Sequence, residues 1–240
     1  MVQVLPLSQI SGMNKINIAI DGLSGCGKSS TAKEVAKALH YKFIDTGAMY
    51  RAVTLYFIQN DIDLTNHDHV VKALSEIQVN FEFNKESQKN ETILNQHNVE
   101  KEIRKMYVSQ MVSPVSAIKE VRVAMVAQQQ EMGKHKGVVM DGRDIGSVVF
   151  PDAKLKVFMT ASTAVRAKRR QEELAEKGEN VALEAIIENL ESRDHQDSTR
   201  DESPLIKVND AIEIDTSDLK FEDQVQKVLD LAVSHIEKAD

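Results

Sequence analysis

The chain has little of what places a protein outside the cell or in a membrane. Its 240 residues include one cysteine, so no disulfide can form within the chain, which suits a reducing cytoplasm. No apolar run reaches the roughly 18 residues that a membrane span needs. Met1–Gly12 lacks a basic stretch followed by an apolar one, so we expect a flexible tail over residues 1–14, not a signal peptide. The sequence therefore predicts a cytoplasmic protein without membrane contact.

Positive charge is also scarce. Lysine and arginine number 30 against 37 acidic residues, and the net charge of −7 leaves no broad basic face for a nucleic acid. Anionic substrates must then be held by local arginines. The chain contains no internal repeat and no low-complexity tract, and its length and 42% hydrophobic content suit one α/β domain with insertions.

The most informative segment runs from Ile16 to Ser30. It opens with an apolar run in which Ile18 and Ile20 are typical of a buried strand. Residues 22–29, GLSGCGKS, then match G-x-x-x-x-G-K-[ST] at every fixed position, and a helical pattern follows at once. A strand, a glycine-rich loop and a helix in this order predict a loop that binds the phosphates of a nucleoside triphosphate.

The composition of this loop has a physical reason. Glycine has no Cβ, so phosphate oxygens can approach backbone N–H groups closely. The start of the following helix adds unpaired N–H groups and the positive end of its dipole. Lys28 would bring a point charge to the β- and γ-phosphates, and Ser29 a hydroxyl for Mg²⁺.

Beyond this loop, strands alternate with helices. Strands are predicted at 41–45, 137–141, 154–160 and 211–215. Helices are predicted at 46–59, 67–77, 99–111, 116–134, from 162, at 181–194 and at 221–237. Asp45-Thr46-Gly47 is expected to cap the first of these helices. This alternation behind a phosphate-binding loop implies a three-layer α/β fold, a parallel sheet with helices on both faces, in one domain over residues 15–240.

One region departs from the alternation. Residues 79–83 alternate apolar and polar side chains, and a polar turn and a return strand at 92–94 follow. This pattern predicts a small β-hairpin within an insertion of about residues 60–115. Pro114 is expected to break the helical pattern here, with Ser113 in the break.

Two further stretches place polar groups after strands. Asp45–Arg51, DTGAMYR, follows the second strand, at the edge that faces the ligand crevice in an open parallel sheet. In the second stretch, Asp141–Gly146, DGRDIG, the carboxylate of Asp141 lies at the end of a core strand. It resembles the acidic group that orients Mg²⁺-bound water in P-loop enzymes. An ordinary helix cap and an ordinary turn are the alternatives.

A third stretch is a charged loop expected from Asp194 to Ser203. Arg193, Asp197 and Arg200 would share one face if the segment were helical. As a lid over about residues 193–204, it would bring arginines to a transferring phosphoryl group and exclude water. A solvated surface is the alternative.

Four motifs together resemble the bacterial cytidylate kinases, nucleoside monophosphate kinases that act on CMP and dCMP. They are GLSGCGKSS at 22–30, DTGAMYR at 45–51, DGRDIGSVVFPDA at 141–153 and RDHQDSTR at 193–200. The resemblance covers nearly everything from Ile16 to the final helix, and the hairpin-bearing insertion is similar to that family's CMP-binding region. It implies a direct, in-line transfer from ATP to CMP or dCMP assisted by Mg²⁺. We expect a monomer.

The resemblance also implies roles for single residues. ATP would be bound by Gly22, Leu23, Ser24, Gly25, Cys26, Gly27, Lys28, Ser29, Ser30 and Arg166. CMP would be bound by Thr46, Arg51, Ser113, Arg122, Arg143, Asp144, Arg193 and Asp197. The catalytic residues would be Lys28, Arg143, Arg193 and Arg200, and Mg²⁺ would be held by Ser29 and, through a water, Asp141. Gln196 and Ser198 stand where relatives often carry arginines, which lowers the charge of the lid.

Two other classes of protein stay open on the sequence alone. One is another small-molecule P-loop kinase, such as a UMP/CMP, adenylate or shikimate kinase. The other is a nucleotide-dependent switch without a phosphoryl acceptor, although the missing N-K-x-D signature counts against a GTPase. A panel of acceptors assayed with ATP and Mg²⁺ would separate them.

Overall fold

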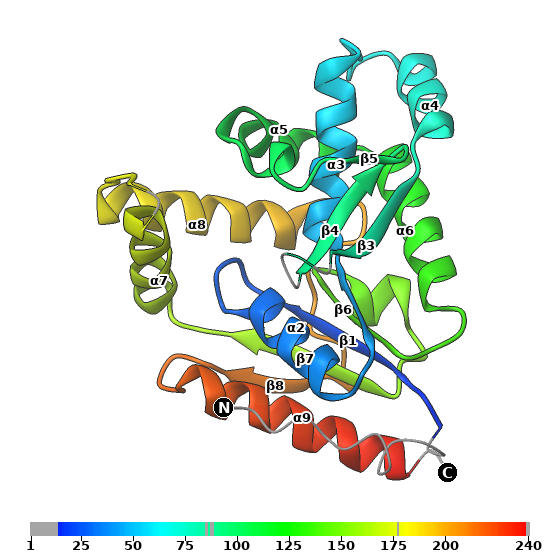
Figure 1. Ribbon diagram of the computed structural model, residues 1–240. Coiled ribbons are helices and arrows are strands. Elements are labelled where there is room, and N and C mark those ends of the chain that lie inside the picture. The colour runs from blue at the N-terminus through cyan, green and yellow to red at the C-terminus, as the bar shows by residue number, and fades with distance from the viewer. Residues whose placement is uncertain (1–13, 85, 87–88, 177, 239–240) are drawn as a thin grey trace. The chain divides into compact units, whose positions relative to one another are not determined.

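A computed structural model describes residues 14–84, 86, 89–176 and 178–238 (Figure 1). The chain forms two compact units, one of Met1–Phe43 with His135–Asp240 and one of Ile44–Lys134. The expected flexible tail lies, apart from Asn14, outside the described residues. Each unit is described by itself.

The first unit is built on a five-stranded sheet in the order β2-β6-β1-β7-β8. The strands are β1 (Asn17–Gly22), β2 (Lys42–Asp45), β6 (Val138–Gly142), β7 (Leu155–Thr160) and β8 (Ile212–Asp215). Strand β1 pairs in parallel with β6 and β7, and β7 pairs in parallel with β8. Ile20 lies opposite Asp141 on one side and Val157 on the other. The predicted parallel α/β fold is confirmed.

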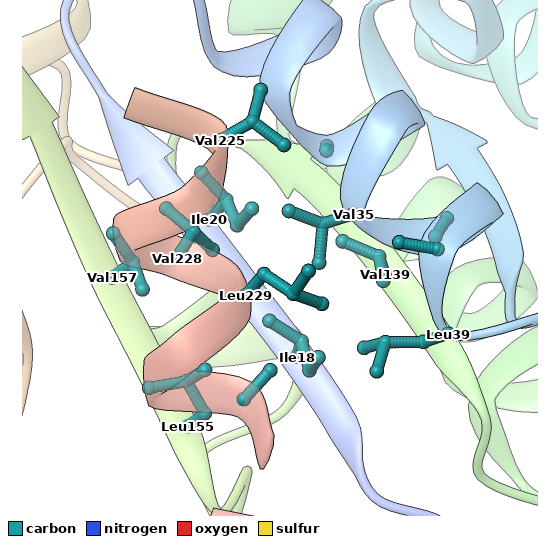
Figure 2. Packing of buried hydrophobic residues seen from close by; sticks show 14 of the residues in the cluster. Ile18, Ile20, Val35, Leu39, Val139, Leu155, Val157, Val225, Val228 and Leu229 are labelled. Carbon is teal, nitrogen blue, oxygen red and sulfur yellow. The ribbon is translucent and has the colours of Figure 1, made fainter. Parts of the chain in front are cut away.

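The main core lies between this sheet and two helices, α2 (Lys28–Ala38) and α9 (Phe221–Glu237). Ile18 and Ile20 alternate along β1, so both side chains point to the same face of the sheet. Figure 2 shows them packed against residues of both helices, namely Val35, Leu39, Val225, Val228 and Leu229. The strand that leads into the phosphate-binding loop is therefore held firmly.

Two more helices of this unit, α7 (Thr163–Glu176) and α8 (Leu183–Thr199), share a small core of Ala167, Leu174, Ile186 and Leu190. The expectation of a loop from Asp194 onward was wrong, because α8 continues to Thr199. The charged side chains of this turn find partners within the unit, as Asp194 does with Arg166 at 2.5 Å. Paired charges of this kind need not stay in a solvated loop.

The second unit carries a three-stranded antiparallel sheet in the order β3-β4-β5. The predicted hairpin is confirmed by β3 (Val79–Asn84) and β4 (Lys89–Leu94), whereas β5 (His97–Asn98) was not foreseen. Its helices are α3 (Thr46–Gln59), α4 (His67–Glu76), η1 (Glu102–Arg104), α5 (Met106–Ala117) and α6 (Lys119–Gly133). The unit begins before and ends after the insertion expected at about 60–115.

The break expected at Pro114 was wrong, because α5 runs through it. Val108 and Val115 are both buried and lie two turns apart on one face of α5, so packing holds the helix together across the proline. The helix ends instead at Ala117, and the next residue, Ile118, is extended with φ −68° and ψ 126°. Residues 99–105, expected to be helical, contain only the short 3₁₀ turn η1.

Candidate functional site

The glycine-rich loop between β1 and α2 requires glycine at specific points. Gly22 has φ 145°, and a Cβ there would lie 1.9 Å from the carbonyl oxygen of Met159. Gly27 has φ 91° and precedes α2 without any side-chain cap. The first N–H groups of α2 thus donate to no side chain at the N-cap, which leaves this helix start suited to binding an anion.

Lys28 is the first residue of α2, directly after this loop, and is 5% exposed. Its Nζ donates to the carbonyl oxygen of Leu23 at 2.5 Å. Burial and, next, the nearby Arg143 lower the pKa of Lys28 from its ordinary value. An anion beside Lys28 would stabilise its charged form, so the loop is electrostatically suited to phosphate.

Cys26 is fully buried, and its Sγ donates to the carbonyl oxygen of Met159 at 3.3 Å. The thiol thus points into the sheet edge, as a small residue that fills the loop. Burial of this kind opposes attack by an alkylating reagent.

A hydroxyl and a carboxylate suited to a metal ion meet where β6 faces α2. Ser29 Oγ donates to Asp141 Oδ2 at 2.6 Å. Both side chains offer oxygen atoms, which Mg²⁺ prefers as ligands, so these two residues fit the expected ion. Among the described residues, no group of three or more histidine, cysteine, aspartate or glutamate side chains could hold a metal.

Asp21 was not foreseen from the sequence. It is the next-to-last residue of β1, is 6% exposed, and accepts hydrogen bonds from the N–H groups of Ile145 at 2.8 Å and Gly146 at 2.7 Å. Burial raises the pKa of Asp21 from 3.8 to about 6, against the opposing effect of these two bonds. The carboxylate fastens the π-helical turn η2 (Ile145–Val149) to β1, directly after Arg143 and the buried Asp144.

Three arginines gather around Asp197 of α8. Arg143 Nε donates to Asp197 Oδ2 at 2.7 Å, and Arg200 Nη1 donates to Oδ1 at 3.2 Å. Burial would raise the pKa of Asp197, but Arg143, Arg200 and Arg193 together hold it below its ordinary value. The cluster thus brings three guanidinium groups, which can donate to phosphate oxygens, to one part of the unit.

Arg166 of α7 is 3% exposed and donates to the carbonyl oxygen of Ser24 at 3.0 Å and to Asp194 at 2.5 Å. Asp194, which sequence reasoning gave no role, also accepts from the N–H of Ser24 at 3.1 Å. The phosphate-binding loop thus rests on side chains from α7 and α8.

In the second unit, the predicted cap at Asp45 is confirmed, since its carboxylate accepts from the N–H of Ala48 at 2.8 Å. The same carboxylate pairs with Arg51 at 3.3 Å and Arg104 at 3.2 Å. Thr46 is buried at the first position of α3. Thr46 and Arg51 therefore lie at one helix start, and Arg104 joins them although no sequence motif singled it out.

The other two predicted CMP residues of this unit lie on different helices. Arg122 of α6 is 2% exposed, donates to the carbonyl oxygen of Ser116 at 3.3 Å, and lies 5.4 Å from the ring centre of Tyr50. Ser113 lies in α5, one turn before Ser116, whose Oγ donates to the Ser113 carbonyl at 3.1 Å. The contact with the Tyr50 ring and the bond to Ser116 hold the Arg122 guanidinium in place.

The predicted residues therefore fall into two groups. The first unit holds the loop 22–30 with Asp141, Arg143, Asp144, Arg166, Arg193, Asp197 and Arg200. The second unit holds Thr46, Arg51, Ser113 and Arg122. Over the described residues, no helix is both long and apolar enough to span a membrane.

A parallel sheet, a P-loop that ends in Lys28 and Ser29, and an arginine cluster in the same unit define a P-loop nucleotide-dependent kinase. The sequence model of the cytidylate kinase family matches residues 18–234. This chain belongs to the cytidylate kinase family.

Curated relatives agree over most of their lengths. The cytidylate kinase of Cytophaga hutchinsonii is 57% identical over 92% of this chain and 94% of its own. The cytidylate kinase of Flavobacterium psychrophilum is 53% identical over 91% and 98%, and that of Bacteroides fragilis 54% identical over 88% and 94%. The membership is therefore set by nearly the whole chain and not by the P-loop alone.

Proposed function

We propose that this protein phosphorylates CMP and dCMP with ATP, giving CDP and dCDP. Its membership of the cytidylate kinase family supports the substrate. The observation that carries the chemistry is the placement of Lys28 and the cluster of Arg143, Arg193 and Arg200 in one unit. Burial and Arg143 both lower the pKa of Lys28 there. Phosphoryl transfer needs positioning and charge neutralisation more than covalent chemistry, and such cations supply both.

The acceptor is itself a phosphate anion, so the reaction needs no strong general base. Loop N–H groups and the start of α2 would hold the donor phosphates. Lys28 would exchange the Leu23 carbonyl for phosphate oxygens. Arg143, Arg193 and Arg200 would screen the repulsion between donor and acceptor, because a guanidinium can fork onto two oxygens where lysine cannot.

Ser29 and Asp141 would hold Mg²⁺, with Asp141 acting through a water. The bound ion would neutralise charge on the β- and γ-phosphate oxygens. The two oxygen atoms already lie close together, since Ser29 Oγ donates to Asp141 Oδ2 at 2.6 Å. Removing either oxygen is expected to raise the Mg²⁺ concentration that activity requires, with little effect on the fold.

The predicted acceptor residues are assigned to two parts of CMP. Thr46, Arg51 and Arg143, with Arg193 and Asp197, are proposed for the phosphate and ribose. Ser113, Arg122 and Asp144 are proposed for the base, since Asp144 and the Ser113 hydroxyl can accept from the cytosine amino group and Arg122 can donate to N3 and O2.

We further propose a monomeric, cytoplasmic enzyme in which about residues 193–204 act as a lid and about residues 60–115 form an NMP-binding insertion. The single cysteine supports the location. Equilibrium sedimentation with and without nucleotides would test the oligomeric state.

The deciding experiment is an ADP-release assay with ATP, Mg²⁺ and one acceptor at a time: CMP, dCMP, UMP, AMP or shikimate. Turnover is expected with CMP and dCMP well above the others. Lys28→Ala, assayed beside the wild type, controls for a contaminating kinase. Turnover restricted to AMP or shikimate, or ATP binding with no acceptor turned over, would contradict the proposal.

A further inference from the structure

The backbone of Ser24, inside the phosphate-binding loop, is held at both its N–H and its carbonyl oxygen. Its N–H donates to Asp194 Oδ1 at 3.1 Å, and its carbonyl oxygen accepts from Arg166 Nη1 at 3.0 Å. Arg166 Nη1 also donates to Asp194 Oδ2 at 2.5 Å. The two side chains therefore form a closed ring of hydrogen bonds with the backbone of one loop residue, Ser24.

The guanidinium of Arg166 is directed at protein acceptors. Besides Ser24 and Asp194, its Nε donates to the carbonyl oxygen of Ala161 at 2.9 Å and its Nη2 to Thr163 Oγ1 at 3.0 Å. With 3% of the residue exposed, this cation is buried and paired with a carboxylate. Such a pair contributes a defined geometry more than net stability.

The surroundings make the ring a rigid support. Leu190 of α8 and Ala167 of α7 belong to the small core that fastens the two helices together. A Cβ on Gly25, the next loop residue, would lie 3.5 Å from Arg166 Cβ and 3.7 Å from Leu190 Cδ2. The loop backbone thus lies directly on α7 and α8.

We propose that Arg166 and Asp194 are positioning residues, which hold Ser24 and Gly25 of the P-loop in the shape that binds the phosphates of ATP. Arg166 then acts on ATP through the loop and not by touching it. This inference rests on the proposed kinase function. Because Arg193 and Asp197 lie on the same helix as Asp194, the ring also fastens the donor loop to the helix that carries the arginine cluster.

The same geometry allows an opposite effect, in which the Asp194 carboxylate competes with phosphate for the Ser24 N–H. Removing the carboxylate would then tighten ATP binding. Neutralisation by Arg166 at 2.5 Å favours the positioning role, because a paired carboxylate repels phosphate little.

The test compares Asp194→Ala, Asp194→Asn and the control Glu191→Ala, which removes an exposed carboxylate one turn earlier on α8. Binding of MgATP without acceptor is measured by titration calorimetry, and kcat and both KM values by ADP release. Asp194→Ala is expected to weaken MgATP binding about tenfold, the equivalent of one hydrogen bond to a charged group, with the KM for CMP within about twofold. Asp194→Asn keeps an oxygen for the Ser24 N–H, so its loss should be smaller, and Glu191→Ala should match the wild type.

Unchanged or tighter MgATP binding in Asp194→Ala would overturn the inference, and so would an equal loss for ATP and CMP. If that variant does not fold, the nearly isosteric Asp194→Asn decides by the same comparison of ATP with CMP. Wild-type protein that neither binds MgATP nor phosphorylates CMP would instead reject the proposed function. The two failures are therefore distinguishable.

Discussion

Asp21 offers a prediction that can be worked from the structure. Burial raises its pKa in the folded protein from 3.8 to about 6. A difference of about two units corresponds to roughly 3 kcal/mol of folding free energy. The folded state binds the proton of Asp21 more tightly than the unfolded state does. The ionised carboxylate therefore lowers the free energy of unfolding by the full amount above about pH 6, and this destabilisation disappears as the pH falls toward about 4. Asp21→Asn cannot titrate, so it lacks this dependence.

The assay is urea unfolding of wild type and Asp21→Asn at steps from about pH 8 to about pH 4. The asparagine side chain keeps one oxygen, which can accept from the N–H of Ile145 or of Gly146, and presents its NH₂ group to the remaining N–H. The variant therefore loses one of the two hydrogen bonds, and it does so at every pH. The stability of wild type relative to the variant should therefore rise by about 3 kcal/mol on acidification, because groups common to both proteins cancel.

A matched control changes Asp218, an exposed carboxylate, to asparagine. The difference in unfolding free energy between this variant and the wild type should vary much less with pH. A difference between wild type and Asp21→Asn that stays constant across this pH range would refute the reasoning. It would mean that the carboxyl of Asp21 titrates alike in the folded and unfolded states.

The remaining predictions concern catalysis. Lys28→Ala should fold normally by circular dichroism yet slow transfer at least ~100-fold, and a folded variant with near-normal turnover would remove Lys28 from the site. Arg193→Ala and Arg200→Ala should lower kcat more than ATP affinity, since contacts made in the transition state appear in kcat; a higher ATP dissociation constant with kcat intact would place them at the donor instead. Wild type should prefer CMP over UMP by about 100-fold in kcat/KM, because mismatched buried polar groups cost roughly 1–3 kcal/mol each. Asp144→Ala and Arg122→Met should reduce that ratio, whereas equal losses for both acceptors would mean that these residues do not read the base.

Secondary structure was predictable where the signal is local. The strand before the P-loop and the helix after it were foreseen, and the N-cap at Asp45 was also foreseen, because its carboxylate meets an N–H only three residues away. The boundaries of α3 and α9 matched for the same reason, since each helix has its own start signal and apolar face.

Two local signals were overruled by packing. Pro114 normally interrupts a helix, yet the burial of Val108 and Val115 holds α5 together around it. The charged segment after Arg193 was predicted to be a loop. It is helical, with Asp194 paired to Arg166 and Asp197 paired to Arg143. In the second case the deciding contacts join residues far apart in the chain.

The sequence by itself determined the phosphate-binding loop, because glycines at set positions within eight residues dictate a backbone that admits phosphate. It also determined the family, through motifs that are each contiguous. Only the tertiary structure decided what supports that loop. Asp21 meets Ile145 across 124 positions, Arg166 meets Ser24 across 142, and Asp194 meets Ser24 across 170. The physical reason is that a carboxylate accepts from whichever donors lie near it in the folded protein. The residues next to Asp21 or Asp194 in the sequence do not indicate which donors these are.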